Sequence, residues 1–180
     1  MDEQTFRELL DPRGILRPGA LAPPPLSAGY TVFAQPGTAA LDVEALKARA
    51  ARFFGAKLGL TVEKKYGFDM PTADAARIVL AADDGTAAGT RLCYGRPVER
   101  SDLDAAERGD PNATGMFLLA QRCPTLWIVS REMDDDRVAL TIAAVMASIL
   151  LGPILSPGGD ELFGVKTARL KLEARAAPYR

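Results

Sequence analysis

The sequence contains no histidine in its 180 residues. Imidazole is the side chain whose unperturbed pKa lies near neutral pH, so its absence excludes Ser-His-Asp and Cys-His catalytic arrangements. It also excludes zinc sites that use a histidine ligand. Any acid–base or nucleophilic chemistry would therefore need a carboxylate, a thiol or an amine with a shifted pKa.

Cysteine and long apolar runs are also scarce. The two cysteines, Cys93 and Cys123, are too few for a disulfide-stapled scaffold and fit a reducing compartment, although a single bridge between them stays open. The longest nearly unbroken apolar stretch, residues 138–151, is shorter than the roughly 20 residues needed to span a bilayer. The N-terminus begins acidic and lacks the basic flank and apolar run of a secretory signal. We therefore expect a soluble, cytoplasmic protein with no membrane span.

The charges nearly cancel, with 22 basic against 23 acidic residues. No summed positive field is available to hold a polyanion, so nucleic acid is not an expected partner. Hydrophobic residues make up 48% of the chain and charged residues 25%, as in ordinary globular proteins. A chain of this length normally buries a substantial core within one domain.

The composition divides the chain into an arm and a body. Residues 1–10 predict a short amphipathic helix, which is marginal unless it packs on a surface. Five prolines between residues 11 and 29 favour extended backbone over helix or sheet. We expect residues 1–29 to form an N-terminal helix and a proline-rich arm, which either lies across the body or reaches a partner. Residues 30–180 are expected to form a single α+β domain.

The first half of the body predicts strands around one helix. Residues 30–34 form a β-prone run, and Asp42 is a plausible N-cap for the following helix. Residues 60–66 have moderate strand character, and residues 77–82 read as a buried strand with which residues 90–94 pair back as a hairpin. The helix after Asp42 carries one apolar stripe, made of Val43, Leu46, Ala50, Phe53 and Phe54.

The second half predicts helices on both sides of one strong strand. A capping-box-like start at Ser101 predicts a helix over residues 101–108, and a second helix is expected over residues 112–122. Residues 126–129 lack alternation, which indicates a strand buried on both faces. Three aspartates precede the apolar residues 138–151, which predict a helix in the core or at an obligate interface.

The C-terminal segment alternates strictly between apolar and charged residues from 168 to 175. We expect a half-exposed strand there, although the same residue types are strong helix formers. The resulting order of elements predicts an α+β fold, a mixed and mainly antiparallel sheet packed against helices.

The sharpest candidate for chemistry is the stretch Cys93-Tyr94-Gly95-Arg96 at the end of a predicted strand. An arginine near Cys93 would lower the thiol pKa and make it a nucleophile. No general base accompanies the thiol in sequence, and buried cysteines on strands are common. The alternatives are a structural Cys93 with Arg96 in a salt bridge, and an anion-binding corner formed by Tyr94 and Arg96.

The aspartates at 134–136 could chelate Mg²⁺ together with Asp83 and Asp84, because that ion prefers clustered hard oxygens. Consecutive aspartates at a helix start cannot all point one way, however, and helix capping explains them. We therefore predict no metal site and no cofactor.

Two functional hypotheses follow. The first is a non-catalytic protein-interaction or assembly module, acting through a partner or a homo-oligomer surface that uses the arm or the apolar helix. The second is a small enzyme or small-ligand-binding protein, accepting a small anionic ligand in a pocket around Cys93, Tyr94 and Arg96, to which either Arg131 or Glu132 is added. We prefer the first, because the second needs several separate features to assemble without a base of suitable pKa.

Overall fold

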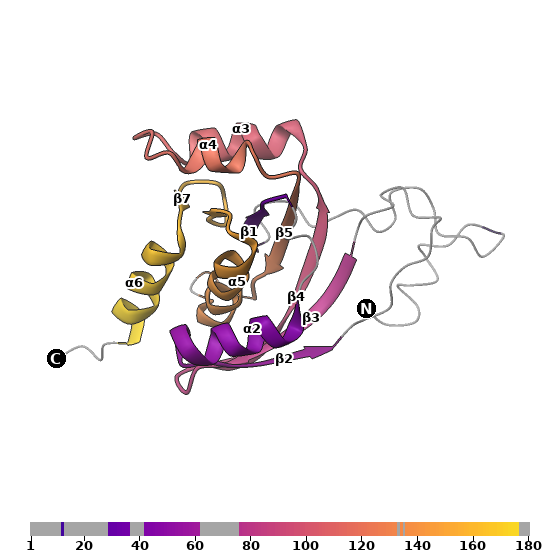
Figure 1. Ribbon diagram of the computed structural model, residues 1–180, viewed down its shortest axis with the longest axis vertical. Coiled ribbons are helices and arrows are strands. Elements are labelled where there is room, and N and C mark those ends of the chain that lie inside the picture. The colour runs from indigo at the N-terminus through magenta and orange to yellow at the C-terminus, as the bar shows by residue number, and fades with distance from the viewer. Residues whose placement is uncertain are drawn as a thin grey trace.

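A computed structural model describes residues 12, 29–36, 42–61, 76–132, 134 and 136–176. Within them the chain forms one seven-stranded sheet in the order β2-β3-β4-β5-β1-β6-β7, in which all neighbouring strands are antiparallel (Figure 1). This confirms the predicted α+β fold. The strands are β1 (Gly29–Ala34), β2 (Lys57–Thr61), β3 (Ala76–Asp83), β4 (Ala88–Pro97), β5 (Thr125–Ser130), β6 (Ile154–Leu155) and β7 (Leu162–Phe163).

Helices pack on both faces of the sheet. One face carries α5 with α2 and α6 beside it, and α3 and α4 pack on the other face over β1, β5 and β6 (Figure 1). None of the described helices is long and apolar enough to cross a bilayer. The helices are α2 (Val43–Arg49), which continues as a π-helical turn (Ala50–Phe54), α3 (Arg100–Arg108), α4 (Met116–Ala120), α5 (Arg137–Leu150) and α6 (Val165–Ala176).

Strand β5 lies between the two hydrophobic clusters. Trp127 and Val129 pack into the cluster under α5, whereas Leu126 and Ile128 pack into the cluster under α3 and α4. Because successive side chains of a strand point to opposite faces, an unbroken apolar run is what a strand between two layers requires. The prediction of a strand buried on both faces is confirmed.

Helix α5 is the centre of the larger cluster. It is capped by Asp136, whose side chain accepts a hydrogen bond from the amide of Ala139, and its C-cap residue, Leu151, has a left-handed conformation. Almost every residue of α5 is buried within the chain, so of the two predicted environments, the core and an obligate interface, the helix occupies the core. Gly152 follows, and a Cβ there would stand 1.9 Å from the carbonyl oxygen of Phe33. The close approach of these two backbones therefore requires glycine.

The C-terminal prediction is wrong, because residues 165–176 form helix α6 and not a strand. Ala168 and Leu172 are buried four residues apart, on one face of a helix, while Leu170 between them is 56% exposed. Residues four apart also share a face in a strand, so the buried pair Ala168 and Leu172 fits the alternating pattern as well as a helix. The Ala, Leu, Lys, Arg and Glu residues here are also strong helix formers, and the helix buries Ala168 and Leu172 in the core cluster that α5 forms.

Several predicted boundaries also need correction. Helix α3 is capped by Glu99, not Ser101, in a reciprocal capping box with Asp102. Only residues 116–120 of the predicted helix 112–122 are helical. Strand β2 begins at Lys57 and not at residue 60. Residues 62–66 of the predicted strand, and nearly all of the predicted arm, lie outside the described residues. Phe53, predicted on the apolar stripe, is 38% exposed.

Candidate functional site

Cys93 lies on β4 and points into the core under α5, where it is fully buried. Burial raises the pKa of its thiol far above the ordinary range, against a smaller lowering effect from a backbone hydrogen bond to Leu80. A thiol held in the protonated form is a poor nucleophile. Cys123 is also free and packs in the other hydrophobic cluster, so the sheet separates the two sulfurs and no bridge forms.

Arg96 lies on the opposite face of β4 and forms a buried, bidentate ion pair with Asp102 of α3. Its Nη1 donates to Oδ2 at 2.6 Å and its Nη2 donates to Oδ1 at 2.7 Å. The same carboxylate accepts a hydrogen bond from the amide of Glu99, so Asp102 both caps α3 and fixes it to the sheet. The sequence-based alternative in which Arg96 forms a salt bridge therefore agrees with the structure, and its partner is Asp102.

The four residues predicted from the sequence to form a site do not converge on one pocket. They are Cys93, Tyr94, Arg96 and Arg131. Tyr94 is on the same face of β4 as Arg96, because strand residues two apart share a face, and Cys93 is on the other face. Arg96 pairs with Leu126 at the start of β5, whereas Arg131 follows the far end of that strand. Arg131 forms an ion pair at 3.2 Å with the exposed Asp134.

Two further arginines tie α5 to the rest of the fold. Arg91 of β4 donates to both carboxylate oxygens of Asp136, the residue that caps α5. Arg137, the first residue of α5, donates to Asp84 at 2.6 Å and also binds the carbonyl oxygen of Leu172 in α6. Together these contacts join the β3–β4 turn, the start of α5 and the end of α6.

These contacts also determine the ionisation of both aspartates. Burial by itself would raise the pKa of Asp84 and of Asp136, but hydrogen bonds from backbone amides and from arginine outweigh it and lower both pKa values. Each carboxylate is thus an ionised acceptor used by the fold. Among the described residues, no group of three or more acidic or sulfur side chains is arranged to hold a metal ion.

A hollow of about 420 Å³ lies between residues 109–116 and residues 160–167. Its buried acid, Asp110, accepts hydrogen bonds from the amide and hydroxyl of Thr114 and from the amide of Phe117. The hydrogen bond from the Thr114 hydroxyl is the largest cause of the lowered pKa of Asp110. A second acid in the hollow, Glu161, is paired with Lys171 at 2.7 Å. Two of the acids that line the hollow, Asp110 and Glu161, are therefore used in holding the loop and α6.

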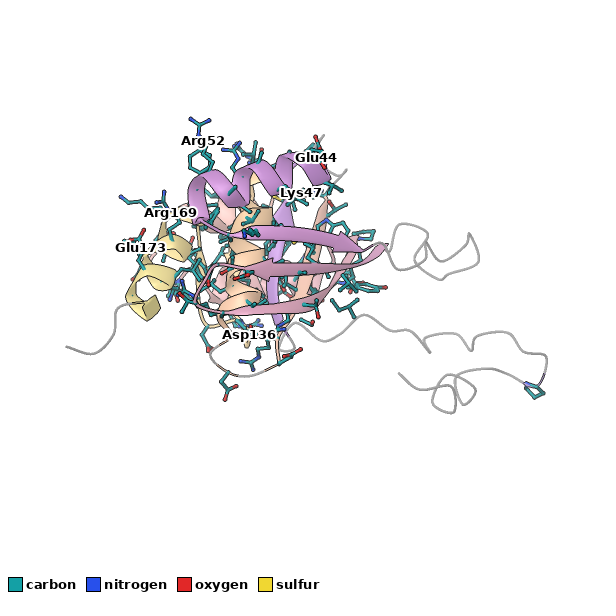
Figure 2. The ribbon with its side chains drawn as sticks, turned by 90° about the horizontal axis from the view of Figure 1, so that it is seen from below. Glu44, Lys47, Arg52, Asp136, Arg169 and Glu173 are labelled. Carbon is teal, nitrogen blue, oxygen red and sulfur yellow. The ribbon has the colours of Figure 1, made fainter. Side chains whose placement is uncertain are left out.

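The sheet presents one broad surface that no described helix covers. Figure 2 looks onto β2, β3 and β4 from the side opposite α5, with no helix in front of them. A shallow hollow of about 360 Å³ lies over their ends. We call this surface the outer face of β2–β4, and it is formed by Lys57, Gly59, Val79, Ala81, Asp83, Ala88, Thr90 and Leu92.

A second exposed feature is the π-helical turn after α2. The ring of Phe53 is partly exposed, and the guanidinium groups of Arg49 and Arg52 lie 5.1 and 5.2 Å from its centroid. We call these three residues the Phe53 cluster. The cluster was not predicted from the sequence, because the apolar stripe placed Phe53 inward. The available signal was the spacing of cations along residues 45–62, which contain four and no acid.

Comparison with known proteins supplies no relative for this chain: no family model, no curated protein and no solved structure matches it.

Proposed function

We propose that this chain is a non-catalytic assembly module that associates with a second copy of itself through the outer face of β2–β4. The observation that carries this proposal is the composition of that face. An antiparallel sheet that meets water on one side normally carries polar side chains there. Six of the eight residues that define this face are glycine, alanine, valine, leucine or threonine, and the other two are Lys57 and Asp83.

The small side chains suit packing against another sheet. Gly59, Ala81 and Thr90 lie side by side across the three strands, and Val79 lies opposite Leu92. Two sheets pack face to face about 10 Å apart, which needs a surface without long, solvated side chains. An uncovered apolar surface of this kind on a folded protein marks an interaction site.

The two charged residues favour a second copy as the occupant. Lys57 and Asp83 are direct cross-strand partners at one end of the face. A two-fold axis that passes beside this pair would place the lysine of one copy near the aspartate of the other. A surface that carries both signs in this way is complementary to its own rotated copy.

The contacts of the residues considered for chemistry support a role without catalysis. Cys93 is buried with a raised thiol pKa, and Arg96 is held by Asp102. Both are explained by the stability of the fold, and Tyr94 and Arg96 face away from the thiol. A pocket uniting these groups, as the alternative hypothesis requires, has no support from this geometry.

The test is sedimentation velocity on the wild type and on two variants of matched charge. Thr90→Glu places a carboxylate in the middle of the outer face, on an exposed position where the strand tolerates it. Leu118→Glu makes the same charge change on the exposed side of α4, outside the face. We expect a wild-type dimer that Thr90→Glu dissociates and Leu118→Glu leaves intact. If both variants sediment as the same species, either both as dimers or both as monomers, the proposal is refuted.

A further inference from the structure

We infer that the Phe53 cluster binds an acidic segment of another protein. The inference is independent of the proposed self-association, because the cluster is not part of the outer face of β2–β4. It rests on the exposure of one aromatic ring, the charges beside it and the backbone that presents it.

The two arginines of the cluster have no acidic partner among the described residues. Each guanidinium group lies over the ring of Phe53, at 5.1 Å for Arg49 and 5.2 Å for Arg52. Two other exposed cations, Lys47 on α2 and Arg169 on α6, are neutralised locally by Glu44 and Glu173. Arg49 and Arg52 thus place two positive charges beside the ring, although the full chain has a net charge of −1. The cluster is therefore a local positive patch on a slightly acidic protein.

The backbone at the cluster departs from an ordinary helix. Helix α2 changes to a π-helical turn at Ala50, and the turn ends at Gly55 with a positive φ of 60°. The wider turn lets Ala50 and Phe54 pack toward the core while Phe53 faces outward. Turns of this kind are rare and occur often at functional sites. In Figure 2 the side chain of Arg52 points away from the body of the protein, at the opposite end of the helix from Glu44.

The chemistry of the cluster defines the partner. A guanidinium group presents paired N–H donors that match a carboxylate, and such charge-assisted hydrogen bonds are stronger than neutral ones. The ring supplies apolar area beside them, and aromatic residues and arginine dominate the energetic centres of protein interfaces. A peptide segment that alternates acidic and apolar side chains fits both the guanidinium groups and the apolar ring. A nucleic acid fits less well, because phosphate recognition depends on many summed cations and the protein carries no net positive charge.

The experiment is fluorescence anisotropy with the full chain and a labelled peptide of alternating glutamate and leucine. The matched probes are a peptide of alternating lysine and leucine and a labelled single-stranded oligonucleotide. We expect the acidic peptide to bind more tightly than either probe. Its affinity should fall as salt is added, because the contacting charges are exposed.

Variants separate the cluster from general charge effects. Phe53→Ala and the double variant Arg49→Gln/Arg52→Gln should each weaken binding by about tenfold or more. Arg169→Gln removes one exposed, already paired cation and should leave the affinity within about twofold. Circular dichroism confirms that each variant is folded. Absence of acidic-peptide binding, equal binding by all variants, or tighter binding of the oligonucleotide would each overturn the inference. Thr90→Glu should not change the affinity, so failure of self-association and failure of this site are distinguishable.

Discussion

The guanidinium group of Arg91 donates to both oxygens of the Asp136 carboxylate, at 2.6 Å from Nε and 3.0 Å from Nη2. Both side chains are almost fully buried, at 7% and 1% exposed. The same carboxylate accepts hydrogen bonds from the amides of Glu132 and Ala139. This pair therefore joins the middle of the sheet to the first turn of the helix at the centre of the core.

Replacing Arg91 by methionine should destabilise the fold strongly. It leaves the buried carboxylate of Asp136 without its charged partner, and breaking a buried ion pair in this way costs about 3–5 kcal/mol. Urea unfolding followed by circular dichroism measures the loss. Arg131→Met is the matched control, because its partner Asp134 is fully exposed and such pairs contribute at most about 1 kcal/mol. Similar losses for the two variants would contradict the account.

Acid should unfold the protein through its aspartates. The pKa of Asp136 and of Asp84 is lower in the folded protein than the ordinary value, despite the opposing effect of burial. Such groups stabilise the fold fully above their unfolded pKa of about 4, and this stability is lost as the pH falls through the folded pKa. We expect the free energy of unfolding to change little between about pH 7 and pH 5 and to decline below about pH 4.

The same series of urea titrations tests the assignment. Asp84→Asn should be less stable at neutral pH and should show a shallower decline in acid, because the variant lacks one of the responsible carboxyl groups. With no histidine in the chain, no inflection is expected near pH 6.5. A free energy of unfolding that rises on acidification below pH 4 would show that these carboxyl groups are not stabilised as described.

A methyl group at Gly95 should disturb the core around the single tryptophan. A Cβ there would stand 2.9 Å from Cε2 and from Cζ2 of Trp127, whose ring is buried and has little room to move. We expect Gly95→Ala to lose about 1–3 kcal/mol of stability, as overpacked cores do. Tryptophan emission should shift at the same time.

Gly59→Ala provides the control for Gly95→Ala. Its nearest neighbour would be the Cβ of Ala81 at 3.7 Å, an ordinary contact. This variant should keep or slightly increase the stability, by up to about 1 kcal/mol, since alanine restricts the unfolded chain. A larger loss for Gly59→Ala than for Gly95→Ala would be inconsistent with the packing at Trp127.

Both cysteines should resist alkylation in the folded protein. Burial raises the pKa of Cys93 far above its ordinary value and that of Cys123 to about 11, so little thiolate is present and access is restricted. Treatment with iodoacetamide at pH 8, followed by mass spectrometry, should give slow labelling that becomes fast only in denaturant. Rapid modification of Cys93 under native conditions would revive the hypothesis of a reactive thiol.

The sequence predicted the fold wherever burial and residue type agreed. The unbroken run at Trp127 and Ile128 indicated a strand between two layers, and the aspartates before residue 137 indicated the cap of α5. It failed at residues 165–176, because the buried positions Ala168 and Leu172 fit both a strand period of two and a helical spacing of four. The local sequence pattern alone cannot decide between a strand and a helix in this segment. Packing of the segment against α5 decides for the helix.

The candidate surfaces were less predictable. The Cys93-to-Arg96 stretch groups chemically active side chains in sequence, but strand alternation sends neighbours to opposite faces. Phe53 was assigned inward on the assumption of regular α-helical turns, and the π-helical turn changes which residues face the core. The outer face of β2–β4 is defined by the pairing of three strands, and no single segment of sequence reveals which of their residues lie side by side.

The central claim is that the outer face of β2–β4 holds two copies of the chain together. Multi-angle light scattering over a dilution series measures the molar mass directly. We predict twice the mass of the 19.2 kDa chain at high concentration, falling toward the monomer on dilution. A monomeric mass at every concentration would contradict the claim.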